Sequence, residues 1–161
     1  MKNRNEIGLD ITESRFTADK LNKLLANYSI FYQNTRGLHW NIKGEKFFEL
    51  HDKFEELYDD LQVKIDEIAE RILTLGYTPE HTYSNYIEES MIPECEKLSD
   101  ARKSVEHVLD SFSILLGIQR DILEMAADAK DEGTVALMGD YIQQQEKLVW
   151  MYSAFLNKLI Y

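Results

Sequence analysis

The feature that most constrains this chain is an apolar pattern spaced three or four residues apart between residues 47 and 75. Its positions are Leu50, Phe54, Leu57, Leu61, Ile65, Ile68, Ile72 and Leu75. This period predicts one long amphipathic helix. The same stretch carries four side chains that often bind metals, namely His51, Glu55, Asp66 and Glu70. At about 100° of rotation per residue, these four share one face of the predicted helix.

Their spacing along that helix excludes a metal site closed by one chain. At about 1.5 Å per residue, Asp66 lies roughly 22 Å and Glu70 roughly 28 Å from His51. Ligands of one metal each lie only about 2 Å from it. A second copy packed antiparallel, across a two-fold axis near residues 60 and 61, brings His51 and Glu55 level with its own Asp66 and Glu70. The pattern therefore predicts two identical sites in each dimer.

His39 joins the predicted site because it lies near the end of the preceding helix, and a short polar turn leads from there into the next helix. Each site would then contain His39, His51 and Glu55 from one subunit and Asp66 and Glu70 from its partner. Imidazole combined with carboxylates suits iron(II) or a similar divalent ion, and zinc is a competent rival.

The rest of the chain predicts three further long helices, over residues 17–41, over residues 98–129 and after Gly133. Positions of the last helix repeat in heptads, at Met138, Tyr141, Gln145, Leu148, Tyr152, Phe155 and Leu159. Residues 76–97 form a long connection, in which residues 84–90 predict a short extra helix. One all-α domain over residues 1–161 is expected, a four-helix bundle of the ferritin-like type with one long crossover and a short tail at residues 1–11.

Three segments resemble a known family, the Dps mini-ferritins, whose name stands for DNA-binding proteins from starved cells. The resemblance is carried by residues 38–44, 47–54 and 66–71, and it continues more loosely to residues 150–156. It implies a ferroxidase centre between two-fold related subunits. The positions that match the family's ligands are His39, His51, Asp66 and Glu70.

Two further residues are interpreted through the same resemblance. Glu55 departs from the family pattern, because many members have Asp there, and the longer carboxylate implies a different rotamer or a bond to only one of two irons. Trp40 matches a tryptophan beside the family's centre, where a radical or an electron would pass. Taken alone, a tryptophan is by default a core or interface aromatic.

The resemblance also implies the reaction and the assembly. Iron(II) would be oxidised at a site holding two irons, preferably by hydrogen peroxide, and stored as ferric mineral inside a hollow dodecamer. Such a protein would protect against oxidative damage. The acidic residues Asp128, Asp131 and Glu132 would line an iron-entry pore near a three-fold axis. An exposed acidic loop is the other interpretation of these three residues.

Composition excludes several other roles. The net charge of −11 argues against a general nucleic-acid surface, and residues 1–11 carry only Lys2 and Arg4 against Glu6 and Asp10, so direct DNA binding is not expected. A single cysteine, Cys95, cannot form an internal disulfide, which agrees with a reducing compartment. Neither a membrane-spanning apolar run nor a signal peptide is recognised. A cytoplasmic location is expected.

Two alternatives come from other classes. A ferritin or bacterioferritin holds its di-iron site inside one bundle through Glu-x-x-His pairs, but none of the four histidines has Glu three positions before it. A non-enzymatic DNA-compacting or scaffold protein with an idle metal site is the second alternative. That role would need a basic surface, which the composition disfavours.

Overall fold

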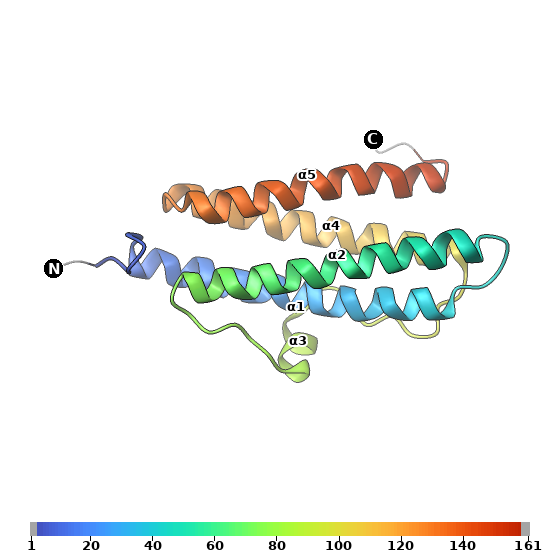
Figure 1. Ribbon diagram of the computed structural model, residues 1–161, viewed down its shortest axis with the longest axis horizontal. Coiled ribbons are helices and arrows are strands. Elements are labelled where there is room, and N and C mark those ends of the chain that lie inside the picture. Colours follow the sequence, from blue (N-terminus) through green and yellow to red (C-terminus); the bar gives the residue numbers. More distant parts are fainter. Residues whose placement is uncertain (1–2, 159–161) are drawn as a thin grey trace.

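The computed structural model describes residues 3–158 and shows four long helices with a short fifth helix in the crossover (Figure 1). The helices are α1 (Ile11–Asn41), α2 (Phe47–Thr74), α3 (Tyr83–Glu89), α4 (Ala101–Asp128) and α5 (Glu132–Phe155). The hairpin of α1 and α2 lies beside the hairpin of α4 and α5, and α3 packs against α1. The predicted bundle with one long crossover is confirmed.

The largest departure from the predicted boundaries is at the start of α1, which begins at Ile11 rather than at residue 17. Asp10 caps this helix, because its carboxylate accepts hydrogen bonds from the backbone N–H groups of Thr12 at 2.8 Å and Glu13 at 3.1 Å. An acidic cap followed three residues later by Glu13 is a recognised start signal. The added turns are mostly polar, so the apolar period did not reveal them.

Residues 3–10 of the expected tail fold back on the start of α1. The backbone N–H of Ile11 donates to the carbonyl of Asn3 at 3.0 Å, and the side chain of Asn5 reaches the carbonyl of Leu75 at 3.5 Å. Lys2, the other cation of that tail, lies outside the described residues. The described part of the segment is therefore held against the end of α2.

The end of α2 is set by Gly76, which has a φ of +94° that favours glycine. The backbone N–H of Tyr77 then donates to the carbonyl of Ile72 at 3.1 Å, and that of Gly76 to Leu73 at 2.9 Å. These bonds satisfy carbonyls that the helix end would otherwise leave free. The crossover starts at this point.

Apolar side chains from all four long helices fill the core, with Phe31 of α1 against Phe112 of α4 at 5.3 Å between ring centroids. The heptad positions of α5 are only partly buried. Met138, Tyr141, Gln145 and Tyr152 are buried, Leu148 is half-buried and Phe155 is exposed, while Leu159 lies outside the described residues. Among residues 3–158, no helix is both long and apolar enough to cross a membrane.

Two largely buried cations of α2 connect it to the second hairpin. Lys64 is 3% exposed, and its ammonium donates to the Asp60 carboxylate at 2.7 Å and to Gln144 of α5 at 2.9 Å. The Arg71 guanidinium contacts the buried Asp131 carboxylate, just before α5, at 2.6 Å. Each buried charge thus has a hydrogen-bonded partner, as burial requires.

Candidate metal centre

The centre is built where α1 ends and α2 begins. A short turn through Gly44, which has a φ of +107°, returns the chain so that His39 near the end of α1 faces His51 near the start of α2. The backbone N–H of Lys43 in this turn donates to the carbonyl of Ser99 at 3.0 Å, which fastens the turn to the crossover. The two imidazole rings stack with centroids 3.8 Å apart and planes 16° apart.

The two histidines are held by a reciprocal pair of hydrogen bonds. Nδ1 of His39 lies 2.7 Å from the carbonyl oxygen of His51, and Nδ1 of His51 lies 2.8 Å from the carbonyl oxygen of His39. A carbonyl can only accept, so in each neutral ring Nδ1 carries the proton and Nε2 keeps its lone pair. Carbonyl-bonded imidazoles of this kind are typical metal ligands with a fixed orientation. The arrangement therefore leaves the Nε2 atoms of two stacked rings as nitrogen donors.

Aromatic rings enclose this pair, and neither ring was singled out from the sequence. Phe47 stacks on His51 at 5.0 Å, and Tyr58 packs edge-on against His39 at 5.3 Å. Desolvation, and then the negative charges of Glu55 and Asp59, raise the pKa of the Tyr58 phenol. Phe47 lies one turn before His51 and Tyr58 two turns after it, so helical spacing was the signal that could have found both.

Of the two default interpretations of Trp40, as a core or as an interface aromatic, the first is wrong. Its side chain is 57% exposed, and the Arg36 guanidinium lies 4.9 Å above the ring. Trp40 thus lies next to the histidine pair in sequence but turns an apolar surface outward. The aromatic side chains packed directly against the candidate ligand rings are Phe47 and Tyr58.

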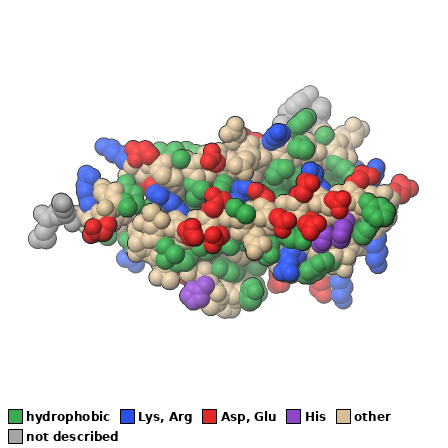
Figure 2. Space-filling model, viewed as in Figure 1, with side chains coloured by type: hydrophobic (Ala, Val, Ile, Leu, Met, Phe, Trp, Pro, Cys, Tyr) green, Lys and Arg blue, Asp and Glu red, His purple; other side chains and the backbone are tan. Residues whose placement is uncertain are grey.

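The carboxylates of the candidate site stay apart from one another within one chain. Glu55, Asp66 and Glu70 are exposed on α2, and Figure 2 shows acidic side chains gathered along this helix, with histidine at the end where it meets α1. Within residues 3–158, no three His, Cys, Asp or Glu side chains come close enough to hold a metal ion. One chain therefore brings together His39 and His51, while Asp66 and Glu70 lie further along the helix.

The acidic residues of the expected pore divide into two kinds. Asp128 and Glu132 are exposed, whereas Asp131 is 2% exposed. The Asp131 carboxylate binds Arg71 and accepts a hydrogen bond from the backbone N–H of Thr134 at 3.0 Å, so it caps α5. These contacts give Asp131 a structural role, because a carboxylate used in this way is turned away from solvent.

The centre of the bundle is occupied by neutral polar groups. The Tyr28 hydroxyl donates to Gln119, Gln119 donates to Gln145 at 2.8 Å, and Gln145 donates back to Tyr28 at 2.6 Å. This closed ring of hydrogen bonds satisfies buried amides and a phenol, and burial raises the pKa of Tyr28 well above its usual value. An intra-bundle di-iron site would need carboxylates and histidine there.

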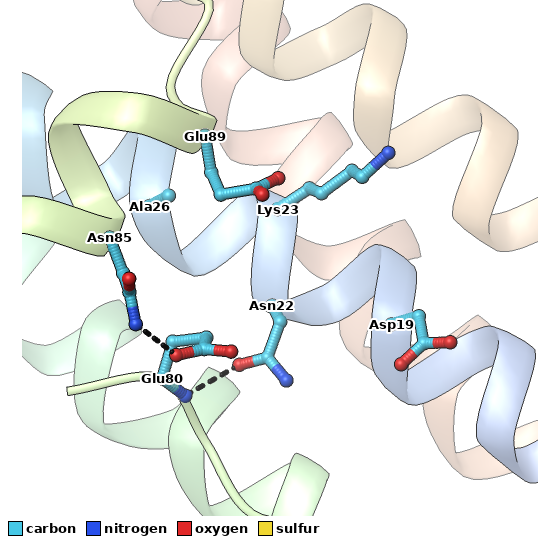
Figure 3. Close-up of a pocket in the computed structure, with 7 residues that line it drawn as sticks. All are labelled: Asp19, Asn22, Lys23, Ala26, Glu80, Asn85 and Glu89. Atoms are coloured by element: carbon cyan, nitrogen blue, oxygen red, sulfur yellow. Dashed lines mark hydrogen bonds between the residues drawn. The ribbon is translucent and has the colours of Figure 1, made fainter.

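A polar pocket between α1 and α3 lies apart from the histidine pair (Figure 3). Three of its polar residues are paired with one another, since Asn22 accepts a hydrogen bond from the backbone N–H of Glu80 at 2.7 Å and Asn85 donates to the Glu80 carboxylate at 2.7 Å. These bonds fasten the crossover to α1. We assign the pocket no chemistry.

Known proteins resemble this chain over nearly its whole length. The ferritin-like domain model matches residues 18–160. The DNA protection during starvation protein of Porphyromonas gingivalis is 46% identical over 86% of this chain and 87% of its own.

Solved structures of Dps proteins are also similar to this chain over most of its length. The Dps protein of Vibrio cholerae, described as a member of a broad superfamily of ferritin-like diiron-carboxylate proteins, is 59% identical, with a TM-score of 0.94 over 97% of this chain and 98% of its own. A zinc-soaked Dps from Listeria innocua is 27% identical, with a TM-score of 0.85 over 88% of this chain and 97% of its own. The chain therefore belongs to the Dps proteins of the ferritin-like family.

Proposed function

We propose that this protein oxidises iron(II) at a centre shared by two copies of the chain and stores the ferric product inside a hollow oligomer. The observation that carries the proposal is the pair His39 and His51, locked by each other's backbone carbonyls so that two Nε2 donors stay available. Imidazole nitrogen with carboxylate oxygen is a ligand set that suits iron(II), and zinc can substitute for it.

The second half of each centre would come from the partner's copy of α2. With α2 helices antiparallel about an axis between residues 60 and 61, the partner's Asp66 comes level with Glu55 and the partner's Glu70 with His51. Exposure of all three carboxylates in the single chain supports this pairing, because they are free to meet a second subunit. Two such centres per dimer follow from the symmetry.

The preferred oxidant in this proposal is hydrogen peroxide. Two iron(II) ions held side by side give one electron each to one peroxide, whose O–O bond breaks and which takes up two protons to form two waters. No hydroxyl radical is released in this balanced step. Where only one iron is present, a nearby aromatic side chain is the source of the second electron, and this is the role proposed for Trp40.

Iron would reach the interior past exposed acids. Asp128 and Glu132 at the turn between α4 and α5 are the residues proposed for an entry pore, where rings of carboxylates would concentrate iron(II). A dodecamer is the proposed assembly and the cytoplasm the proposed location, both on the family relationship alone.

The alternative role is DNA compaction or scaffolding with an idle metal site. A relative of this protein is named for DNA protection. This chain, however, has a net charge of −11. Sequence-independent DNA binding depends on Lys and Arg neutralising phosphates, so this charge disfavours a direct contact. Removing iron(II) and peroxide together would protect DNA without contact.

The test is anaerobic addition of iron(II) to the purified protein, followed by hydrogen peroxide and optical detection of ferric iron. It is repeated with His51→Ala, with Asp66→Ala, and with the two variants dissociated together and reassembled. A mixed dimer places both substitutions in one centre and leaves the other centre intact. Random mixing makes half of the dimers mixed, so about a quarter of the wild-type centres should return.

Two results would contradict the proposal. Oxidation that is equally fast in wild type and in both variants would show that the centre is idle. Full loss in each variant without recovery on mixing would show that the ligands act within one chain. Fast oxidation in wild type, loss in each variant and partial recovery in the mixture would support a shared ferroxidase centre.

A further inference from the structure

The end of α2 is tied to the start of α5 by the side chain of Arg71. Both helix ends lie at the same end of the bundle (Figure 1). Nη2 of Arg71 donates to the Asp131 carboxylate at 2.6 Å, and its Nε donates to the Thr134 hydroxyl at 3.0 Å. A Cβ on Gly133 would lie 2.8 Å from both terminal nitrogens of the guanidinium. The start of α5 therefore encloses the Arg71 head, and a glycine at position 133 leaves room for it.

The groups that accept hydrogen bonds from Arg71 are themselves fixed. The Asp131 carboxylate also accepts from the backbone N–H of Thr134 at 3.0 Å and from the Thr134 hydroxyl at 2.6 Å. The backbone N–H of Asp131 donates to the carbonyl of Ala126 at 2.8 Å, which joins the turn to the end of α4. Arg71, Asp131 and Thr134 thus form a closed ring of hydrogen bonds, which we call the Arg71 clamp.

This position of the guanidinium is unfavourable for α5 taken alone. The guanidinium lies at the N-terminal, positive end of the helix dipole, where a cation is destabilising. The Arg71 side chain is only 18% exposed, and replacing a buried ion pair by apolar groups is often neutral or stabilising. The contribution of the clamp is therefore geometric, because it gives the last turn of α2 a fixed place relative to α5.

A candidate metal ligand depends on that last turn. Glu70 directly precedes Arg71, and α2 ends at Thr74, so Glu70 lies about one turn from the helix end, where carbonyls lack partners within the helix. Helix ends of this kind open locally unless other contacts hold them. The Glu70 side chain is exposed, so its position before a metal binds follows that of the backbone.

We propose that the Arg71 clamp positions Glu70 for the metal centre by holding the last turn of α2 in place. This inference rests on the shared centre proposed above. Arg71 is a positioning residue rather than a ligand, since its side chain leaves the helix about 100° away from Glu70 and is directed to α5. A metal site needs its ligands held to within about 0.5 Å, and a clamp on the next residue along the helix supplies that precision.

The test is a double-mutant cycle between Arg71→Lys and Glu70→Gln, measured as the affinity of the whole protein for cobalt(II) by visible absorption. Lysine keeps a cation beside Asp131 but lacks the planar fork that reaches Asp131 and Thr134 together. Each single variant should lower the affinity by roughly tenfold or more, as loss of a ligand or of its orienting group does. In the Glu70→Gln background, Arg71→Lys should have no further effect, because the clamp acts through Glu70.

A second variant, Asp131→Asn, reaches the clamp from the other helix. Asparagine still accepts the backbone N–H of Thr134, so the cap of α5 remains, but the charged partner of Arg71 is lost. Cobalt(II) affinity should fall here too. In Asp131→Asn and in Arg71→Lys, the backbone amides of residues 71–75 should exchange hydrogen faster than in wild type.

The matched control is Arg120→Lys. Arg120 of α4 contacts Glu146 of α5 at 3.0 Å in an exposed ion pair outside the clamp, so the same change of side chain is made at another arginine–carboxylate contact with α5. Its cobalt(II) affinity and its amide exchange at residues 71–75 should be those of wild type.

An equal loss of affinity from Arg71→Lys in both backgrounds would overturn the proposal, because it would show that Arg71 only stabilises the fold. Wild-type affinity in both Arg71→Lys and Asp131→Asn would overturn it as well. In either case, weaker binding by Glu70→Gln and His51→Ala would leave the shared centre standing. Wild-type affinity in Glu70→Gln would instead remove Glu70 from the centre, and the positioning role would fail together with the shared centre as proposed.

Discussion

At the scale of single residues, the proposed chemistry depends on how His39 and His51 hold each other. Each ring is fixed by a carbonyl of the other residue, so neither imidazole needs a separate carboxylate to orient it. Phe47 and Tyr58 then restrict ring rotation from outside. A ligand oriented in advance loses little freedom when a metal binds.

A first prediction concerns these donors. His39→Ala should lower the affinity for cobalt(II), used as a spectroscopic substitute for iron(II), by roughly tenfold or more, because one nitrogen donor and the partner ring of His51 are both lost. Cobalt(II) titration followed by visible absorption measures it. His81→Ala is the matched control, since His81 is exposed in the crossover. Equal loss in both variants would show that the histidine pair is not the site.

A second prediction concerns Gly133. A Cβ built there would lie 2.8 Å from the Arg71 guanidinium, which would have to shift and so disturb its contact with the buried Asp131. Gly133→Ala should therefore destabilise the protein by about 1–2 kcal/mol despite the better helix propensity of alanine. Gly139→Ala, with nothing within 4 Å of its Cβ, should instead stabilise it by up to about 1 kcal/mol. Urea unfolding of both variants would be compared, and a stabilised Gly133→Ala would contradict this role of Arg71.

At the scale of elements, one of the buried amides that fasten the crossover to α1 also reaches α4. The side chain of Asn34 donates to the carbonyl of Pro93 at 2.9 Å, accepts from the backbone N–H of Cys95 at 2.8 Å, and lies 3.3 Å from Nε2 of His107 in α4. With the amide nitrogen as donor, Nε2 of His107 must be unprotonated to accept. One side chain thus links α1, the crossover and α4.

A third prediction follows from that geometry. Desolvation lowers the pKa of His107 below its usual 6.5, against an opposing effect of Asp110. The unfolded chain therefore binds this proton more readily than the folded chain. The His107 contribution to stability is complete above about pH 6.5 and is lost as the pH falls from there through the lowered pKa. His107→Gln keeps an acceptor that does not titrate, so its unfolding free energy should fall less than that of wild type between about pH 7 and pH 5.

The matched control for this pH profile is His81→Gln, because the exposed His81 makes no contact with Asn34 among the described residues. Its profile should follow wild type. Identical profiles for wild type and His107→Gln would show that the Asn34 contact does not depend on the charge of His107. Urea unfolding at a series of pH values provides the measurement.

At the scale of the whole molecule, assembly and metal binding should be linked. In the proposed dimer, α2 docked on its own copy would bring Glu55, Asp66 and Glu70 of two chains together. Bound divalent ions would neutralise carboxylates that otherwise repel. A ligand that binds only the associated form must also strengthen association.

A fourth prediction therefore concerns the dissociation constant of the proposed dimer. In metal-free protein this constant should fall as the salt concentration is raised. At low salt it should also fall when zinc(II) is added. Screening weakens repulsion between exposed like charges, which explains the first effect. Sedimentation over a dilution series, with a chelator or with zinc(II), measures both. The variant Asp66→Asn should associate more tightly without metal and respond less to zinc(II). Weaker association at high salt would mean that ion pairs hold the interface.

The sequence alone determined the helical elements and the face of α2 that carries the candidate ligands. The apolar period of residues 47–75 predicted α2 to within one residue, because a buried helical stripe must repeat every three or four positions. The same period put His51 and Asp66 on one face and too far apart for one metal. Helix geometry is local, so these conclusions need no tertiary contact.

Only the tertiary structure decided how the side chains on those elements are used. Stacking of His39 on His51, the packing of Tyr58 and the burial of Asp131 against Arg71 each join residues from different elements, at distances set by the turn or by the bundle. The sequence pattern does not distinguish Asp128 from Asp131. In the structure Asp128 is exposed, whereas Asp131 caps α5. Burial and pairing depend on what lies opposite a residue in space, and no local pattern contains that information.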